Sequence, residues 1–116
     1  IIGTAYGSAY VAMNSKSIGA DLVYAWPGAS IGMMDAKSAA RIMYADEIEK
    51  AEYGAAALAE KAAEYEELQS SVLSAARRGY VDTIIDAQDT RKYVIGAFEM
   101  LFTKREERPA KKHGTV

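Results

Sequence analysis

The chain has 116 residues, of which half are hydrophobic and about a quarter are charged, with 14 basic against 16 acidic side chains. This composition is typical of one ordinary globular domain and excludes a disordered or fibrous chain. The lack of cysteine excludes disulfides, thiolate metal sites and a cysteine nucleophile. The net charge of −2 gives no general reason to expect nucleic acid as a partner, and no apolar run approaches the roughly 18 residues of a membrane span.

Charged residues are scarce in the first third of the chain. Residues 1–34 contain only Lys16 and Asp21, whereas residues 35–69 are mainly acidic and residues 70–116 mainly basic. A nearly uncharged segment is typical of buried, two-sided packing, so we expect the core and any site in this first third. The first residue is Ile1 rather than methionine, and we expect the sequence to be part of a longer chain.

Short strands and a short helix alternate along this first third. Ile1 and Ile2 are typical of the tail of a buried strand, and the small residues of segment 4–10 predict a tight turn. A short buried helix is predicted from Ser8 to about Asn14, followed by a strand over 22–26 that Pro27-Gly28 ends. Residues 30–34 are consistent with a second short strand. The alternation predicts an α/β fold rather than a helical bundle.

Helical patterns dominate from Asp35 to Gly79. Asp35 can cap a first helix, and further helices are predicted over 46–53 and 55–68. Ser70-Ser71 can cap a fourth helix that ends at Arg77-Arg78-Gly79. The inward face of the first of these helices is expected to carry Ala39, Ile42, Met43 and Tyr44.

The end of the chain combines one strand, one helix and a polar tail. Residues 80–85 predict a short strand, and Asp86 with Asp89 resembles a capping box for a helix that runs to about Thr103. We therefore expect a folded part over residues 1–103 and a charged tail over 104–116. One side of the last helix is expected to carry Tyr93, Ala97, Met100 and Leu101.

The stretch Tyr6-Gly7-Ser8-Ala9-Tyr10 is the most informative for function. A strand, a turn of small residues and a helix start leave backbone N–H groups unpaired and directed toward one spot. Such a spot favours negative charge, whether a phosphate or an oxyanion that develops during a reaction. From spacing alone, however, most turns of small residues before a helix serve only close packing.

Other chemistry has weaker support in the sequence. Ser8 has no histidine partner except His113, which lies in the charged tail, so a Ser–His nucleophile is not expected. The remaining candidate groups have structural explanations. The carboxylates of the 55–68 helix are expected to form its solvated face, and the aspartates of segment 82–89 are expected to serve as turn and capping residues. The aromatic and methionine side chains of the first third are expected in the core. These groups are Glu60, Glu64, Glu66 and Glu67; Asp82, Asp86 and Asp89; and Tyr24, Trp26, Met33 and Met34. No metal site is expected.

Five ordered blocks cover nearly the whole chain and resemble one enzyme family. They are similar to the C-terminal part of the carboxyltransferase subunits of biotin-dependent acyl-CoA carboxylases and decarboxylases, such as the propionyl-CoA carboxylase beta chain and the methylmalonyl-CoA decarboxylase alpha subunit. The match is looser over residues 50–71. The blocks are Ala5-Tyr-Gly-Ser-Ala-Tyr10 with Met13-Asn14; Gly19-Ala-Asp-Leu-Val-Tyr-Ala-Trp-Pro27; Ala75-Ala-Arg-Arg-Gly-Tyr-Val-Asp82; Ile84-Ile-Asp86 with Thr90-Arg91; and Lys104-Arg-Glu106 with Arg108-Pro109 and Lys111-Lys-His-Gly114.

The resemblance implies a partial domain of the crotonase-like fold and a role in moving a carboxyl group between biotin and a short-chain acyl-CoA. It implies a biotin-facing stretch at Tyr6, Gly7, Ser8 and Ala9, where the backbone N–H groups of Ser8 and Ala9 stabilise the ureido oxyanion of biotin. Ser8 stands where the family commonly has glycine. Val11 matches the position that lines the acyl pocket, and an apolar residue there implies a small apolar acyl chain.

The same resemblance implies partners. These are a biotin carboxyl carrier domain, the N-terminal half of the same type of subunit, and either biotin carboxylase or membrane decarboxylase subunits, in a trimer of dimers. It implies a cytoplasmic location, or one peripheral to a membrane decarboxylase complex, and an inactive fragment when the acyl-CoA half is missing. Two alternatives stay open: another crotonase-like acyl-CoA enzyme of the hydratase or isomerase type, which needs a positioned acid or base such as Glu, and a non-catalytic helical assembly module.

Overall fold

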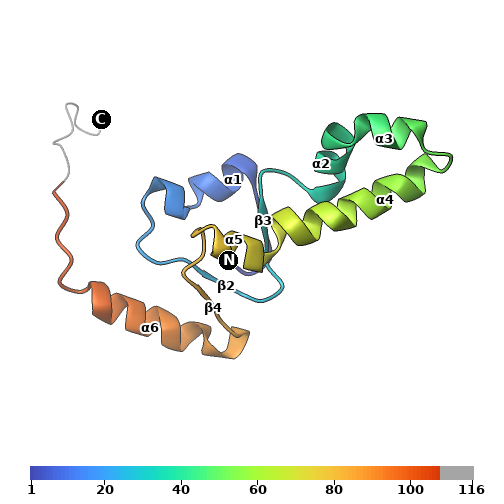
Figure 1. The fold of residues 1–116 in the computed structure, drawn as a ribbon. Helices are drawn as coiled ribbons and strands as arrows, with labels where there is room; N and C mark the ends of the chain where they lie inside the picture. The colour runs from blue at the N-terminus through green and yellow to red at the C-terminus, as the bar shows by residue number, and fades with distance from the viewer. Residues whose placement is uncertain (108–116) are drawn as a thin grey trace.

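The computed structural model describes residues 1–107, so the end of the predicted tail, including His113, lies outside the described residues. Figure 1 shows a central region of short strands, a helical arm on one side and a separate helix on the other. The elements are β1 (Thr4–Tyr6), α1 (Gly7–Ala12), η1 (Lys16–Ile18), β2 (Tyr24–Ala25), β3 (Ser30–Gly32), α2 (Ala36–Met43), α3 (Ala45–Lys50), α4 (Gly54–Tyr65), the π-helical segment η2 (Glu66–Ser70), α5 (Val72–Arg77), β4 (Thr83–Ile84), η3 (Ala87–Asp89) and α6 (Thr90–Leu101).

The strands form two small parallel sheets, one pairing β1 with β3 and the other pairing β2 with β4. Residue Ile1 connects them, because its amino group donates a hydrogen bond to the Tyr24 carbonyl at 2.7 Å and its carbonyl accepts one from the Trp26 N–H at 3.0 Å. This is the bonding pattern of a parallel ladder. The predicted α/β fold is confirmed, although the regular strand begins at Thr4 rather than at Ile1-Ile2.

The core between the sheets and α5 is built from small and β-branched side chains. Val23, Ala25 and Ile31 of the strand region pack with Val72 and Ala75 of α5. No residue of α1 is buried, so the prediction of a helix here is confirmed but the prediction that it is buried is wrong. The helix lies on the surface, and the short uncharged side chains leave its backbone accessible.

Helices α2, α3 and α4 form the arm that projects from the sheets in Figure 1. Buried alanines make the contact: Ala39 and Ala40 on α2 and Ala62 on α4. The prediction that Ile42 and Met43 face inward is wrong, because they are 68% and 61% exposed. Alanine allows the two helix backbones to approach closely, and the large side chains are displaced to the outer face.

The predicted caps have different outcomes. Asp35 accepts hydrogen bonds from the Ser38 N–H, and Ser71 accepts one from the Ser74 N–H, so both predicted N-caps are confirmed. The capping box at Asp86 and Asp89 is wrong, since neither side chain makes a capping hydrogen bond. The chain enters α6 through the 3₁₀ turn η3, and Asp89 already has helical backbone angles, whereas a capping residue has an extended backbone.

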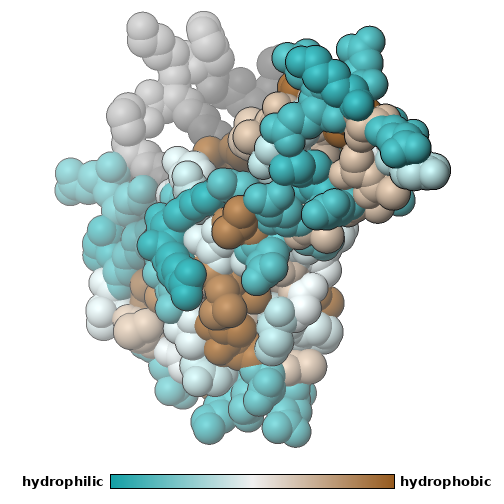
Figure 2. Space-filling model, turned by 45° about the vertical axis from the view of Figure 1, so that its right-hand side comes forward, coloured by the Kyte–Doolittle hydropathy of each residue, from teal (hydrophilic) through white to brown (hydrophobic). Residues whose placement is uncertain are grey.

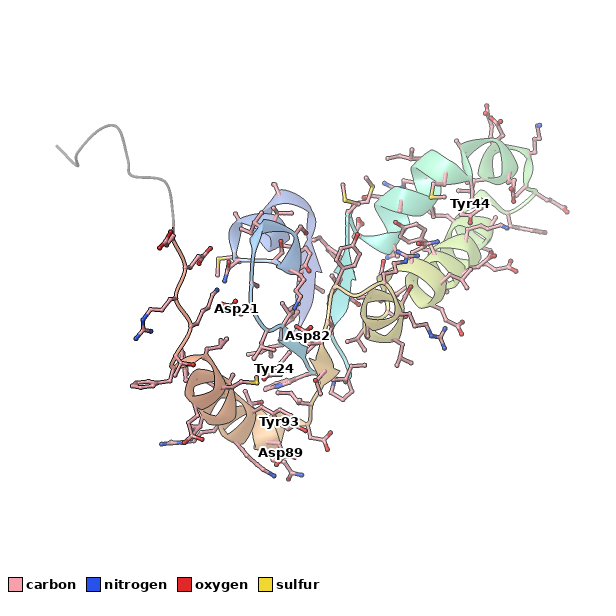
Figure 3. The ribbon with its side chains drawn as sticks, turned by 60° about the vertical axis from the view of Figure 1, so that its left-hand side comes forward. Asp21, Tyr24, Tyr44, Asp82, Asp89 and Tyr93 are labelled. Carbon is pink, nitrogen blue, oxygen red and sulfur yellow. The ribbon has the colours of Figure 1, made fainter. Side chains whose placement is uncertain are left out.

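Two aromatic residues, Tyr24 of β2 and Trp26 just after it, contact helix α6. The Trp26 indole N–H donates to the Thr90 hydroxyl at 2.9 Å, and the rings of Tyr24 and Tyr93 meet edge to face at 5.5 Å (Figure 3). These contacts agree with a structural role for Tyr24 and Trp26. Met100, expected on the same side of α6 as Tyr93, is 63% exposed, and no residue of α6 is buried.

A carboxylate connects the segment after α1 to the start of β4. Both oxygens of Asp82 accept hydrogen bonds from the Lys16 ammonium at 2.8 Å, and one also accepts from the Val23 N–H at 2.8 Å. Lys16 also donates to the Asp21 carbonyl at 3.0 Å. The hydrogen bond from Lys16, with a further contribution from the Val23 N–H, holds the pKa of Asp82 below its usual 3.8 despite an opposing effect of burial. We call this group the Asp82 clamp.

The turn from β1 into α1 needs glycine. Gly7 has φ +58°, and a Cβ added there would lie 3.0 Å from the carbonyl oxygen of Met33. L-residues avoid this backbone conformation, and the close carbonyl leaves little room for a side chain.

We expect Asp82→Ala to lower the free energy of unfolding by about 1–3 kcal/mol, because it leaves the buried Val23 N–H without an acceptor. Asp82→Asn should lose less, since its amide oxygen can still accept that bond. Because the folded pKa is depressed, the contribution of the ionised carboxylate is present above about pH 3.8 and disappears as the pH falls through the lower folded pKa. Urea unfolding between pH 3 and pH 7 checks both points. The difference in stability between the wild type and Asp82→Asn should shrink toward the acid end, and the exposed Asp86→Asn serves as the control.

For the β1–α1 turn, Gly7→Ala should lower the free energy of unfolding by about 1–2 kcal/mol, from the strained φ and the Met33 carbonyl. Gly3→Ala is the matched control, because no atom lies within 4 Å of its added Cβ and its φ is outside the left-handed region. Equal stabilities of the two variants in urea unfolding would contradict the assignment of strain to Gly7.

Candidate functional site

The start of α1 presents unpaired backbone donors at the surface. Tyr6 is the N-cap and its side chain makes no capping hydrogen bond. Ser8 and Ala9 are exposed, and their N–H groups have no acceptor among residues 1–107. Gly7, by its left-handed conformation, allows β1 to pass directly into the helix. The local geometry that the sequence predicted at Tyr6–Ala9 is present, and it can hold an anion or an oxyanion.

A cavity of about 260 Å³ lies against one side of this helix start. Val11 is 39% exposed and shares the wall of the cavity with Gly7. We call it the α1–α5 cavity, because α1, β3, η2 and the end of α5 enclose it. Its lining residues are Gly7, Tyr10, Val11, Ser17, Ile31, Gly32, Met33, Tyr65, Gln69, Ala75, Arg78 and Tyr80.

The predicted site residues divide between two hollows. Gly7 and Val11 line the α1–α5 cavity, whereas Tyr6 and Ala9 line a second hollow of about 400 Å³ beside β1. Ser8 belongs to neither wall and lies exposed at the start of α1. The structure therefore brings Tyr6–Ala9 and Val11 together on one short helix, with α1 between two concave surfaces.

Sequence reasoning missed the polar residues that complete the α1–α5 cavity. These residues lie far from α1 in the chain. They are Tyr65 at the end of α4, Gln69 in η2, Arg78 at the C-cap of α5, and Tyr80 just after it. The Arg78 guanidinium donates a hydrogen bond to the Gln69 side-chain oxygen. The only sequence signal was the block containing Arg78 and Tyr80, whose position relative to α1 depends on tertiary packing.

Tyr10 is the least satisfied polar group of the cavity wall. Its hydroxyl is buried and has no hydrogen-bond partner within residues 1–107. Burial raises the pKa of this hydroxyl, and the neighbouring Tyr80 adds to the increase. The phenol therefore remains neutral at physiological pH.

The lining of the α1–α5 cavity carries a positive charge. Among residues 1–107, Arg78 is the one charged side chain in the lining, and no Asp or Glu contributes to the wall. Met33, expected in the core, is 78% exposed at the rim, so that prediction is wrong. A site with a cationic group, aromatic hydroxyls and an apolar floor suits a small anion with an apolar part.

Residues 1–107 contain neither a metal-binding cluster nor a membrane-spanning helix. No group of three or more His, Asp or Glu side chains there is arranged to hold a metal ion. In the same residues, no helix combines the length and the apolar character needed to cross a bilayer.

Comparison with known proteins gives a consistent picture. The model of the carboxyl transferase domain matches residues 1–116. The chain is 46% identical over 116 residues to the propionyl-CoA carboxylase beta chain of Saccharopolyspora erythraea, with 97% of this chain and 21% of that protein covered. It is 46% identical over 112 residues to the methylmalonyl-CoA decarboxylase subunit alpha of Propionigenium modestum, with 97% and 22% covered.

Among solved structures, the transcarboxylase 12S hexamer with methylmalonyl-coenzyme A and methylmalonic acid bound matches with a TM-score of 0.91 at 46% identity, covering 98% of this chain and 22% of that one. The chain thus spans about a fifth of the length of the relatives it matches. The family model covers every residue of the sequence, and the fold matches that of a transcarboxylase subunit. The chain belongs to the carboxyl transferase domain family, whose members act on acyl-CoA as carboxylases, decarboxylases and transcarboxylases, and its fold is crotonase-like.

Proposed function

We propose that this chain is part of a carboxyltransferase that moves a carboxyl group between biotin and a short-chain acyl-CoA. The observation that carries the proposal is the start of α1, where Ser8 and Ala9 expose backbone N–H groups without protein acceptors in the described part of the chain. Such donors stabilise negative charge that develops on an oxygen, and they need no reorganisation when it forms.

Biotin fits this position by its chemistry. When bound, biotin supplies a ureido group that accepts and releases the carboxyl group. The chain's own contribution is to donate from the Ser8 and Ala9 N–H groups to the ureido oxygen, at a helix start that Gly7 permits by its left-handed backbone. The short side chains of Ser8 and Ala9 leave their backbone accessible, and the Ser8 hydroxymethyl stands where the family commonly has glycine.

The acyl-CoA part of the proposal rests on Val11. This side chain lies one helical turn after Gly7 and forms part of the apolar wall of the α1–α5 cavity, together with Ile31 and Met33. A cavity of about 260 Å³ is below the roughly 300–1,000 Å³ of sites for drug-sized ligands, so it suits a short acyl chain rather than the whole coenzyme.

We also propose the assembly that relatives suggest. The named relatives are subunits of carboxylase, decarboxylase and transcarboxylase complexes, and the 12S structure is a hexamer. Partners are therefore a biotin carboxyl carrier domain, the N-terminal half of the same type of subunit, and biotin carboxylase or membrane decarboxylase subunits, within a homo-oligomer in the cytoplasm. The 116 residues alone are expected to be inactive.

The two alternatives have less support. A hydratase or isomerase needs a carboxylate near the oxyanion donors, and among residues 1–107 no Asp or Glu lines the α1–α5 cavity or the hollow beside β1 that Ala9 lines. A helical assembly module was suggested by the alanine-rich segment 55–68, yet α4 uses Ala62 to pack against α2 within the chain. On the face in Figure 2, hydrophilic side chains gather over the arm, and the hydrophobic ones surface mainly below it.

A pair of substitutions at Ser8 tests the oxyanion role in a complete subunit that carries this chain. Ser8→Ala keeps the backbone N–H and should leave biotin-dependent carboxyl transfer within about threefold of wild type. Ser8→Pro removes one donor and should lower kcat about 10²–10³-fold. Because proline favours an extended backbone at the residue before it and Gly7 is left-handed, circular dichroism and urea unfolding of Ser8→Pro must match those of Ser8→Ala for the comparison to test the donor.

The assay uses free biotin and a series of short-chain acyl-CoA substrates. Equal activities of Ser8→Pro and Ser8→Ala would remove the backbone donor from the mechanism. A wild-type subunit without biotin-dependent turnover on every short acyl-CoA would overturn the proposed function itself.

Val11 tests the acyl pocket. Val11→Ala enlarges the cavity and should raise kcat/KM for butyryl-CoA relative to propionyl-CoA about tenfold, the scale of one methylene in an apolar pocket. Val94→Ala on α6 is the matched control, because Val94 is also 39% exposed and lies outside the cavity. The same ratio in both variants would show that Val11 has no part in acyl selection.

A further inference from the structure

The α1–α5 cavity contains a positive charge without a neutralising partner. Among the residues 1–107 that line it, Arg78 alone is charged. In the same residues, no carboxylate forms an ion pair with Arg78. Arg78 is exposed, so its guanidinium is accessible to a ligand, and the complement of a guanidinium on the wall of a concave, partly apolar site is an anion.

The fold holds this guanidinium in place. Arg78 is the C-cap of α5, and its side chain donates to the Gln69 oxygen on η2. The next residue, Gly79, has φ +82°, and this turn returns the chain so that Tyr80 joins the same wall. Gln69 engages one guanidinium nitrogen, and the other donors of the planar fork stay available for a ligand.

The rest of the wall indicates what kind of anion fits. Val11, Ile31 and Met33 provide an apolar surface, and the tyrosines provide polar edges. A cavity of about 260 Å³ has room for a few heavy atoms beside the guanidinium. A carboxylate on a short apolar group matches both features, since a carboxylate binds the guanidinium fork through two parallel hydrogen bonds.

We propose that Arg78 binds the free carboxylate of the carboxylated acyl group in the α1–α5 cavity, while Val11 and Met33 contact its apolar part. This rests on the proposed function, because carboxyl transfer to acyl-CoA creates this carboxylate and the reverse reaction consumes it. Arg78 is thus a substrate-binding residue that distinguishes the carboxylated from the uncarboxylated thioester. The other anionic group that could meet the guanidinium is a phosphate of the coenzyme.

The experiment measures dissociation constants of methylmalonyl-CoA and propionyl-CoA for a complete subunit that carries this chain, by calorimetry without biotin. Arg78→Gln should weaken methylmalonyl-CoA tenfold or more and change propionyl-CoA by less than about twofold. Arg78→Lys keeps the charge without the fork and should recover part of the lost affinity. Arg77→Gln is the matched control, a neighbouring exposed arginine outside the cavity, and should change neither constant.

Each other outcome overturns the assignment. If Arg78→Gln weakens both thioesters equally, the guanidinium binds a phosphate of the coenzyme. If it behaves like Arg77→Gln, Arg78 is a solvated residue. Because binding is measured without biotin, these failures are distinct from a failure of the proposed function, which would show as a wild-type subunit without biotin-dependent turnover.

Discussion

The close approach of Gly7 to the carbonyl of Met33 is the constraint on which the candidate site depends. Parallel pairing places Tyr6 opposite Gly32, so the chain must leave β1 right beside the end of β3. A left-handed glycine is what allows α1 to begin at once, with a would-be Cβ only 3.0 Å from that carbonyl. The helix therefore begins at the surface with its first donors unpaired. The exposed N–H groups of Ser8 and Ala9 follow from the strand pairing and need no side-chain chemistry.

Small residues allow close approach of the backbone elsewhere in the molecule as well. Ala25, Ala40 and Ala62 allow strands and helices to approach closely, so the elements are brought together by backbone contact as much as by large core side chains. Large apolar side chains such as Ile42 and Met43 then lie on the outer face.

Local signals in the sequence predicted what local physics controls. Asp35 and Ser71 were predicted as caps because a short polar side chain three residues before a free N–H can satisfy it, and both make that bond. One local prediction failed, the capping box at Asp86 and Asp89, because the chain enters α6 through a 3₁₀ turn. The other features that sequence reasoning missed depend on distant partners. The pairing of Ile1 with β2, the exposure of Met33 and the cavity that Arg78 and Val11 both line are set by chain segments separated by tens of residues. The start of α1 was predictable because it is local, and the cavity that completes it was not.

One short segment connects the site to the rest of the fold. Arg78 and Tyr80 line the α1–α5 cavity, and Asp82, two residues later, holds Lys16 and the Val23 N–H. Lys16 begins η1, whose next residue, Ser17, also lines this cavity. The clamp therefore connects two chain segments that line the cavity, and the left-handed Gly79 turns the chain between Arg78 and Tyr80. Since a shift of about 1 Å in a positioning group can lower a rate markedly, the Asp82 clamp joins the stability of the sheet to the geometry of the cavity.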